Sequence, residues 1–85
     1  MGRKRPPKLG DAVLVEWVDI YEQCHDDPAR AQIKRFRTLT YFLGWRGKGK
    51  ANRQLVCTST IDCDTGEYYG CCSYPAGCVL SVTVL

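Results

Sequence analysis

The residue types best suited to bind a ligand gather in residues 45–53, where basic side chains alternate with glycine. The candidate ligand-binding residues of this segment are Trp45, Arg46, Lys48, Lys50 and Arg53. Glycine lets backbone N–H groups approach a phosphate closely, and the interleaved bases neutralise its charge. Trp45 at the edge of the segment would stack on a base, with Tyr41 or Tyr21 nearby. The pattern favours an anionic ligand, whereas the alternative is a solvated loop whose tryptophan belongs to the core.

Six cysteines in 85 residues raise the question of a metal site. Structural zinc sites usually bring their cysteines in pairs spaced C-x2-C. No such pair occurs along Cys57, Cys63, Cys71, Cys72 and Cys78. Neighbouring residues of a strand point to opposite faces, so only one of Cys71 and Cys72 could join a given site. We therefore expect no metal and interpret the cysteines as small buried hydrophobic residues, with a zinc site built from four of these five as the alternative.

Catalysis is not expected from the remaining chemistry-bearing residues. Cys24 and His25 would act as nucleophile and base only if both side chains met and a third group oriented the imidazole, which sequence neighbours rarely achieve. The acids fall mostly in turns, such as the hairpin around residues 62–67, rather than converging in a cleft. Residues 47–50 lack the spacing and the strand–helix context of a phosphate loop. We therefore predict a protein that is not an enzyme and needs no cofactor.

The elements that must position these residues are mostly short strands. Alternating or apolar runs bounded by turn signals predict strands over residues 12–20, 38–45, 54–61, 67–73 and 78–85. The first strand places Val13, Val15 and Trp17 on one face, and the second does the same with Leu39, Tyr41, Leu43 and Trp45. A hairpin turn at residues 64–67 and a one-turn connection at residues 75–77 join the last three strands.

Residues 21–36 break this alternation. Asp27 and Pro28 are typical of a helix start, as the cap and the first helical residue. A short helix from there to about Phe36 would bury Ile33 and Phe36. The order of the connections (long, medium, tight, then one helical turn) is typical of SH3-like and Sm-like barrels. We therefore predict an all-β fold, a small five-stranded SH3-like (Sm-like) barrel with one short helix in the first long loop.

The charge of the chain is distributed unevenly. Residues 1–53 carry all twelve Lys and Arg together with six acids, whereas residues 54–85 carry three acids and no base. Such a split indicates a side that faces a polyanion or self-association between unlike faces, with solubility as the simpler explanation. The basic, proline-bearing residues 1–9 predict a flexible arm ahead of a single domain over residues 10–85.

No targeting or membrane segment is expected. The basic residues near the N-terminus are not followed by the apolar stretch of a secretory signal before Asp11, and no run is long enough to span a bilayer. We therefore expect a cytoplasmic protein without a membrane partner, in a compartment that keeps thiols reduced.

Three short motifs stand out along the chain. They comprise Val13, Val15, Trp17 and Asp19 near the start; Thr38 with Thr40, Tyr41 and Leu43 in the second predicted strand; and Pro75, Gly77, Cys78 and Val79 before Leu85. Together they resemble small uncharacterised tailed-phage proteins that share a V-x-V-x-W-x-D opening and a P-x-G-C-(V/I) closing motif. Thr40 stands where those proteins often have glycine. The resemblance implies a phage or prophage origin and a barrel fold, but no activity.

These observations lead to one functional hypothesis and two alternatives. The leading hypothesis is a phage-encoded, non-enzymatic binding module in the cytoplasm of the infected bacterium. It would modulate a host process or block host defence by occupying a host target, with a host protein as the favoured partner. The first alternative is binding of nucleic acid or a nucleotide through residues 45–53. The second is a structural or assembly protein, a homo-oligomer that pairs through the edge of its last strand.

Overall fold

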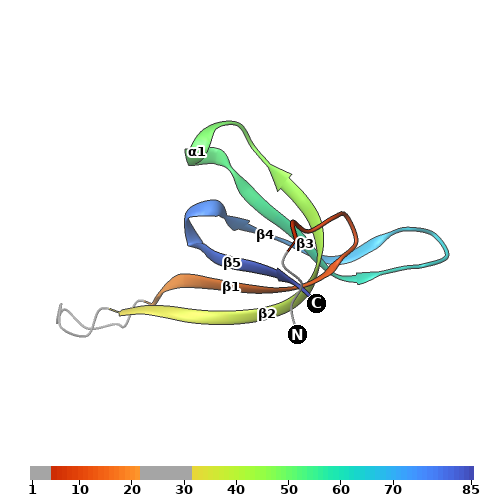
Figure 1. Ribbon diagram of the computed structural model, residues 1–85, viewed down its shortest axis with the longest axis horizontal. Coiled ribbons are helices and arrows are strands. Elements are labelled where there is room, and N and C mark those ends of the chain that lie inside the picture. Colours follow the sequence, from red (N-terminus) through yellow and green to blue (C-terminus); the bar gives the residue numbers. More distant parts are fainter. Residues whose placement is uncertain (1–4, 22–31) are drawn as a thin grey trace.

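The computed structural model describes residues 5–21 and 32–85, and within them five strands form one antiparallel sheet (Figure 1). The elements are β1 (Ala12–Tyr21), β2 (Gln32–Arg46), α1 (Gly49–Asn52), β3 (Gln54–Ile61), β4 (Tyr68–Pro75), the 3-10 turn η2 (Ala76–Cys78) and β5 (Val79–Val84). The strand order is β4-β3-β2-β1-β5, so β5 returns beside β1 at the far side of the sheet. The predicted all-β class and the five strands are confirmed.

The sheet is bent into two limbs (Figure 1). One limb contains β1, β5 and residues 32–41 of β2, which pair with β1; the other contains β3, β4 and the end of β2 from Tyr41 to Arg46, which pairs with β3. Within the described residues β4 and β5 are the two outer strands, and no ladder joins them. The sheet is therefore open, with a concave face between its limbs.

The core lies on this concave face. Its buried apolar members are Val13, Val15, Phe42, Leu55, Cys57, Tyr74 and Val84. Two threonines are buried among them, and both hydroxyls are paired: Thr40 donates to the carbonyl of Thr58 at 2.8 Å, and Thr58 donates to the carbonyl of Tyr69 at 2.6 Å. Because buried hydroxyls with partners avoid the cost of desolvation, these polar residues are compatible with the core.

The predicted helix ending at Phe36 is wrong over its last residues, because β2 begins at Gln32. Ile33 and Phe36 are 70% and 41% exposed rather than buried. The strand is favoured here because β1 offers a partner along its whole length, and Phe36 stacks on Trp17 with ring centroids 4.7 Å apart. The predicted helix start at Asp27 lies outside the described residues.

The helical elements that the described residues do contain are α1 and η2, each a single turn. Neither lies in the first long connection, where the sequence predicted the helix; α1 lies between β2 and β3, and η2 lies between β4 and β5. In residues 5–21 and 32–85 no helix has the length and apolarity needed to cross a membrane.

A bulge in β2 changes which residues share a face. The register with β3 shifts between Phe42 and Gly44, so Leu43 has no partner in the ladder. One extra residue reverses the alternation of side chains beyond it. Trp45, opposite the buried Leu55, therefore lies on the core side, and the prediction that it shares a face with Tyr41 is wrong. Gly44 adopts a φ of 131°, which side-chain-bearing residues rarely adopt.

The cysteines are less buried than predicted. Among those described, Cys57 is buried and Cys78 is half-buried, whereas Cys63, Cys71 and Cys72 are exposed. Cys71 and Cys72 lie on β4, and an outer strand is covered by a neighbour on one side only. Burial raises the pKa of the Cys57 thiol to about 11. Residues 5–21 and 32–85 contain no group of three or more side chains placed to hold a metal ion.

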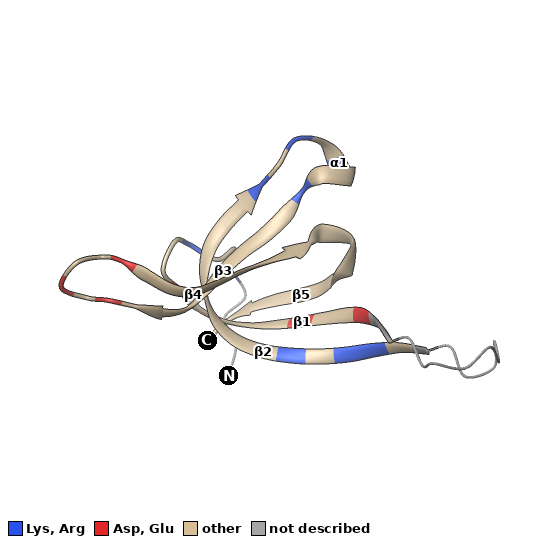
Figure 2. Cartoon of the chain, turned by 180° about the vertical axis from the view of Figure 1, so that it is seen from behind, with Lys and Arg blue, Asp and Glu red and all other residues tan. Residues whose placement is uncertain are grey.

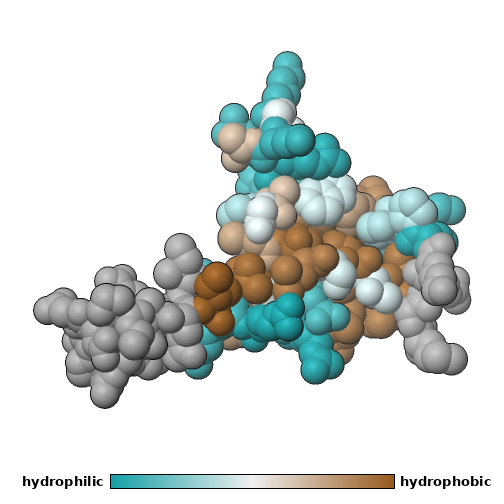
Figure 3. All heavy atoms as spheres, turned by 60° about the vertical axis from the view of Figure 1, so that its left-hand side comes forward, coloured by the Kyte–Doolittle hydropathy of each residue, from teal (hydrophilic) through white to brown (hydrophobic). Residues whose placement is uncertain are grey.

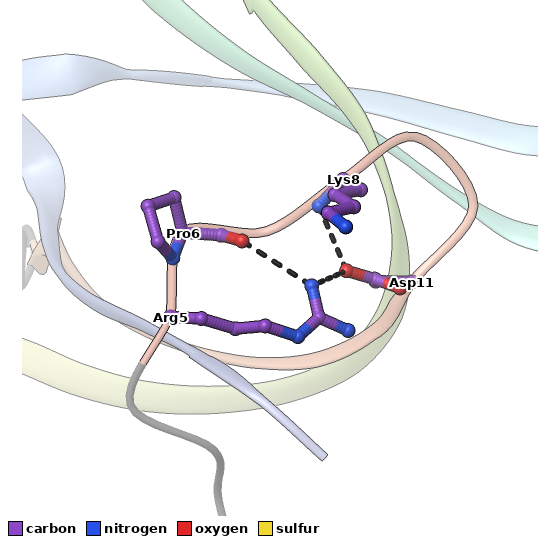
Figure 4. A network of polar contacts seen from close by, with 4 residues as sticks. All are labelled: Arg5, Pro6, Lys8 and Asp11. Carbon is purple, nitrogen blue, oxygen red and sulfur yellow. Dashed lines mark hydrogen bonds and ion pairs between the residues drawn. The ribbon is translucent and has the colours of Figure 1, made fainter.

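The chain enters β1 through a compact polar turn (Figure 4). The Asp11 carboxylate accepts a hydrogen bond from the Arg5 guanidinium at 2.8 Å and another from the backbone N–H of Lys8 at 2.7 Å. The backbone N–H of Gly10 donates to the carbonyl of Phe42 at 2.8 Å, which ties the turn to β2. These contacts lower the pKa of Asp11, with the hydrogen bond from Arg5 as the largest cause.

Candidate functional site

The predicted binding residues lie together at the tip of the β2–β3 hairpin. Arg46 is the last residue of β2, and Arg53 directly precedes β3. Lys48 directly precedes α1, and Lys50 lies within it. All four side chains are exposed, and they are named here the basic tip. Figure 2 shows the tip projecting from one limb, away from the acidic β3–β4 hairpin. No Asp or Glu occurs in residues 28–61, so the positive potential of the tip is not offset by neighbours in the chain.

One glycine sets the shape of the basic tip. Gly47 has a φ of 93°, and a Cβ at this position would collide with the backbone carbonyl oxygen of Asn52. Glycine therefore permits the chain to close this turn tightly before α1. By contrast, a Cβ on Gly49 would meet no atom within 4 Å, although its φ of 75° also favours glycine.

Trp45 lies where the basic tip joins the sheet. It is 36% exposed, and its ladder partner is the fully buried Leu55. The guanidinium carbon of Arg53 lies 5.1 Å from the centre of the indole ring, a cation–π contact that orders both side chains. A base that stacks on Trp45 must use the other face of the indole or displace Arg53. Tyr41 lies on the opposite side of the sheet, and the Tyr21 side chain is outside the described part.

A cluster of aromatic rings between the two limbs was not predicted from the sequence. The indole of Trp17 stacks on Phe36 and meets the ring of Tyr74 at a centroid distance of 5.2 Å and an angle of 59°. The indole N–H donates to the hydroxyl of Thr38 at 3.0 Å, which holds the ring in place. The three rings come from β1, β2 and β4: Trp17 and Phe36 are ladder partners on neighbouring strands, and the bend of the sheet brings Tyr74 of β4 to them.

An apolar cavity of about 430 Å³ opens beside this cluster, and it is named here the aromatic groove. Its lining residues are Trp17, Val18, Asp19, Cys72, Ser73, Tyr74, Pro75 and Cys78. Figure 3 shows one face of the molecule, on which hydrophobic atoms gather below a hydrophilic projecting part. Pro75 and Ala76 adjoin the basic tip, since the backbone N–H of Ala76 donates to the carbonyl of Arg53 at 2.9 Å.

The Tyr74 hydroxyl, which lines the aromatic groove, stays neutral at ordinary pH. The Cys72 thiol donates to the Tyr74 hydroxyl at 3.2 Å. Burial, together with this hydrogen bond, raises the pKa of Tyr74 to about 12. A hydroxyl with so high a pKa does not serve as a base near pH 7. Tyr74 therefore offers the groove a neutral polar group rather than a base.

The acidic residues Asp62, Asp64 and Glu67 lie in the turn between β3 and β4, away from the basic tip. The Asp62 carboxylate accepts hydrogen bonds from the backbone N–H groups of Asp64 at 2.8 Å and Thr65 at 3.2 Å. These bonds lower the pKa of Asp62. Asp62 thus stabilises the β3–β4 hairpin, and Figure 2 shows the acids of this hairpin well apart from the basic tip.

Comparison of the chain with protein families, curated proteins and solved structures found no match. Several residues of the motifs that resemble tailed-phage proteins have a structural role. Val13 and Val15 are core residues, and Trp17 packs against the core. Trp17 and Pro75 also line the aromatic groove. What the site binds must therefore be inferred from its geometry and charge.

Proposed function

We propose that this protein is a phage-encoded, non-enzymatic binding module that occupies an anionic target in the cytoplasm of the host bacterium through its basic tip. The observation that carries the proposal is the exposure of four cations on one hairpin, with no acid in residues 28–61. Such a patch attracts polyanions and gives salt-dependent binding. The phage origin and the host setting are supported by the sequence motifs alone.

The proposed fold type is an SH3-like or Sm-like barrel that is open on one side. It is supported by the strand order, in which β5 returns beside β1, and by the contact of Trp17 with Tyr74, which brings β1 and β4 together across the open side. In such a fold, loops and the open end are the natural places for a binding site.

The test of the basic tip is a charge reversal with a matched control. The test variant carries Lys48→Glu and Lys50→Glu, and the control carries Arg35→Glu and Arg37→Glu, which changes the net charge equally on exposed residues of β2. Heparin serves as the polyanion probe, and the salt concentration that elutes each variant is the readout.

The test variant should elute at clearly lower salt than the control, because only the former loses the cations of the proposed site. Equal elution of the two variants would indicate attraction to net charge alone and would remove the basic tip from the proposal.

A second candidate function, assembly into a homo-oligomer, is favoured by the two outer strands. In the described residues, β4 and β5 each have one edge with no ladder partner. Such edges can pair with another chain. Light scattering coupled to size-exclusion chromatography tests this candidate: a defined oligomer that persists on dilution would support it, and a monomer at all concentrations would contradict it.

A further inference from the structure

The basic tip and the aromatic groove are neighbours at the surface of the fold, because Pro75 of the groove is the ladder partner of Gln54, the residue after Arg53. In the ladders, Trp45 is opposite Leu55, and Leu55 is opposite Tyr74. This row crosses three strands on the concave face, so the backbones of Trp45 and Tyr74 are about 10 Å apart at the usual strand spacing. Trp45 also contacts Arg53 of the tip, and Tyr74 lines the groove. A ligand that reaches from one to the other therefore needs to be only a few chemical groups long.

The two parts of this surface call for opposite chemistry. The basic tip presents four exposed cations. The residues that line the groove include no Lys or Arg and one acid, Asp19, and its other walls are aromatic, apolar or uncharged. The matching ligand therefore has an anionic portion outside the groove and a flat, uncharged portion inside it.

We propose that this surface binds single-stranded nucleic acid, with phosphates on the basic tip and an unpaired base in the aromatic groove. An unpaired base is flat and neutral, and it is linked to a phosphate through a short sugar. The proposal rests on the proposed function, in which the tip binds an anionic target, and adds the class of that target.

Two other anionic ligands fit the surface less well. The bases of a duplex are stacked and paired inside the helix, so they cannot enter a groove between two limbs of a sheet. An acidic peptide could pair its charged side chains with the basic tip, but those side chains offer no flat, uncharged group for the aromatic groove. Neither uses both the cations and the aromatic walls.

Adjacent cysteines on β4 provide a matched pair of variants. Cys72 lines the groove, whereas Cys71 is not among its lining residues, and both side chains are exposed. Cys72→Trp should fill the groove, and Cys71→Trp adds the same bulk on the other face of the strand. Because both positions are exposed, each variant is expected to fold, which thermal unfolding checks directly.

The assay is the fluorescence anisotropy of a short labelled oligo(dT) with each reduced variant, beside heparin elution. Cys72→Trp should bind oligo(dT) at least about tenfold more weakly, the scale of one lost stacked base, while eluting from heparin like the wild type. Cys71→Trp should match the wild type in both assays. Equal oligo(dT) affinity of the two variants would overturn the groove assignment, even if the basic tip still governed heparin binding.

Other outcomes separate the remaining explanations. If neither oligo(dT) nor heparin binding responds to reversal of Lys48 and Lys50, the proposed function itself fails. If polyglutamate or a blunt duplex binds as tightly as oligo(dT) and loses affinity in Cys72→Trp, the ligand class is wrong. If Cys72→Trp does not fold, alkylation of the wild-type cysteines provides the test. Bound oligo(dT) should slow the alkylation of Cys72 but not that of Cys71. Equal alkylation of Cys72 with and without oligo(dT) would contradict the proposal.

Discussion

Neutralising half of the basic tip should reduce the salt dependence of binding to single-stranded DNA by about half. The perturbation is the double substitution Lys48→Gln and Lys50→Gln. Both side chains are exposed, and the Lys48 side chain does not cap α1. Glutamine keeps much of the length of lysine and removes its charge, so the change isolates electrostatics from shape.

The magnitude can be worked from the number of cations at the tip. On single strands, each neutralised phosphate contributes about −0.7 to the slope of log K against log salt. Four contacts by the exposed cations therefore predict a slope of about −2.8 for the wild type and about −1.4 for the double variant. Four is the upper limit, because Arg53 also lies over the ring of Trp45.

The measurement is a series of anisotropy titrations with labelled oligo(dT) at increasing potassium chloride. The matched control carries Arg35→Gln and Arg37→Gln, which removes the same charge from exposed residues of β2 outside the tip. An unchanged slope in the tip variant, or an equal reduction in the control, would refute the assignment of phosphate contacts to the tip.

Three other substitutions test the fold that carries the site. Leu55→Ala, at a fully buried residue, should lower the free energy of unfolding by about 2–5 kcal/mol; urea titrations showing no loss would contradict the assigned core. Gly47→Ala should lower the melting temperature, because its Cβ would meet the Asn52 carbonyl; an unchanged value would mean that the tip adopts another turn. The lowered pKa of Asp11 stabilises the fold above the ordinary value of 3.8 and ceases to do so as the pH falls through the folded-state pKa. The stability advantage of wild type over Asp11→Asn should therefore shrink in acid, and parallel pH profiles of thermal unfolding would count against the Arg5–Asp11 pair.

Much of the strand pattern could be predicted because it is a local property. The alternation of Val13, Val15 and Trp17 places apolar side chains on one face of an extended chain, whatever the rest of the protein does. The turn residues between the later strands restrict the backbone in the same local way. The exposure of the basic segment was also predictable as the solvated-loop alternative, since closely spaced cations and glycines do not pack into a core.

The errors arose where distant residues decide the structure. Asp27 and Pro28 are genuine local signals for a helix start, but residues 32–36 pair with β1, and the stacking of Phe36 on Trp17 belongs to that pairing. The exposure of Cys71 and Cys72 depends on β4 lying at the side of the sheet, which no local pattern states.

The sequence by itself determined the all-β class, the strands and a cluster of bases on one connection, because period-two alternation, turn chemistry and charge act over a few neighbouring residues. Only the tertiary structure decided that Trp17, Phe36 and Tyr74 form one aromatic cluster and that Trp45 lies on the core side of the sheet. The strands must pair in register and the sheet must bend before the three rings can meet, and one bulge must reverse the faces of β2 before Trp45 can lie on the core side. Those events depend on contacts between residues far apart in the chain, and so does the groove that completes the proposed site.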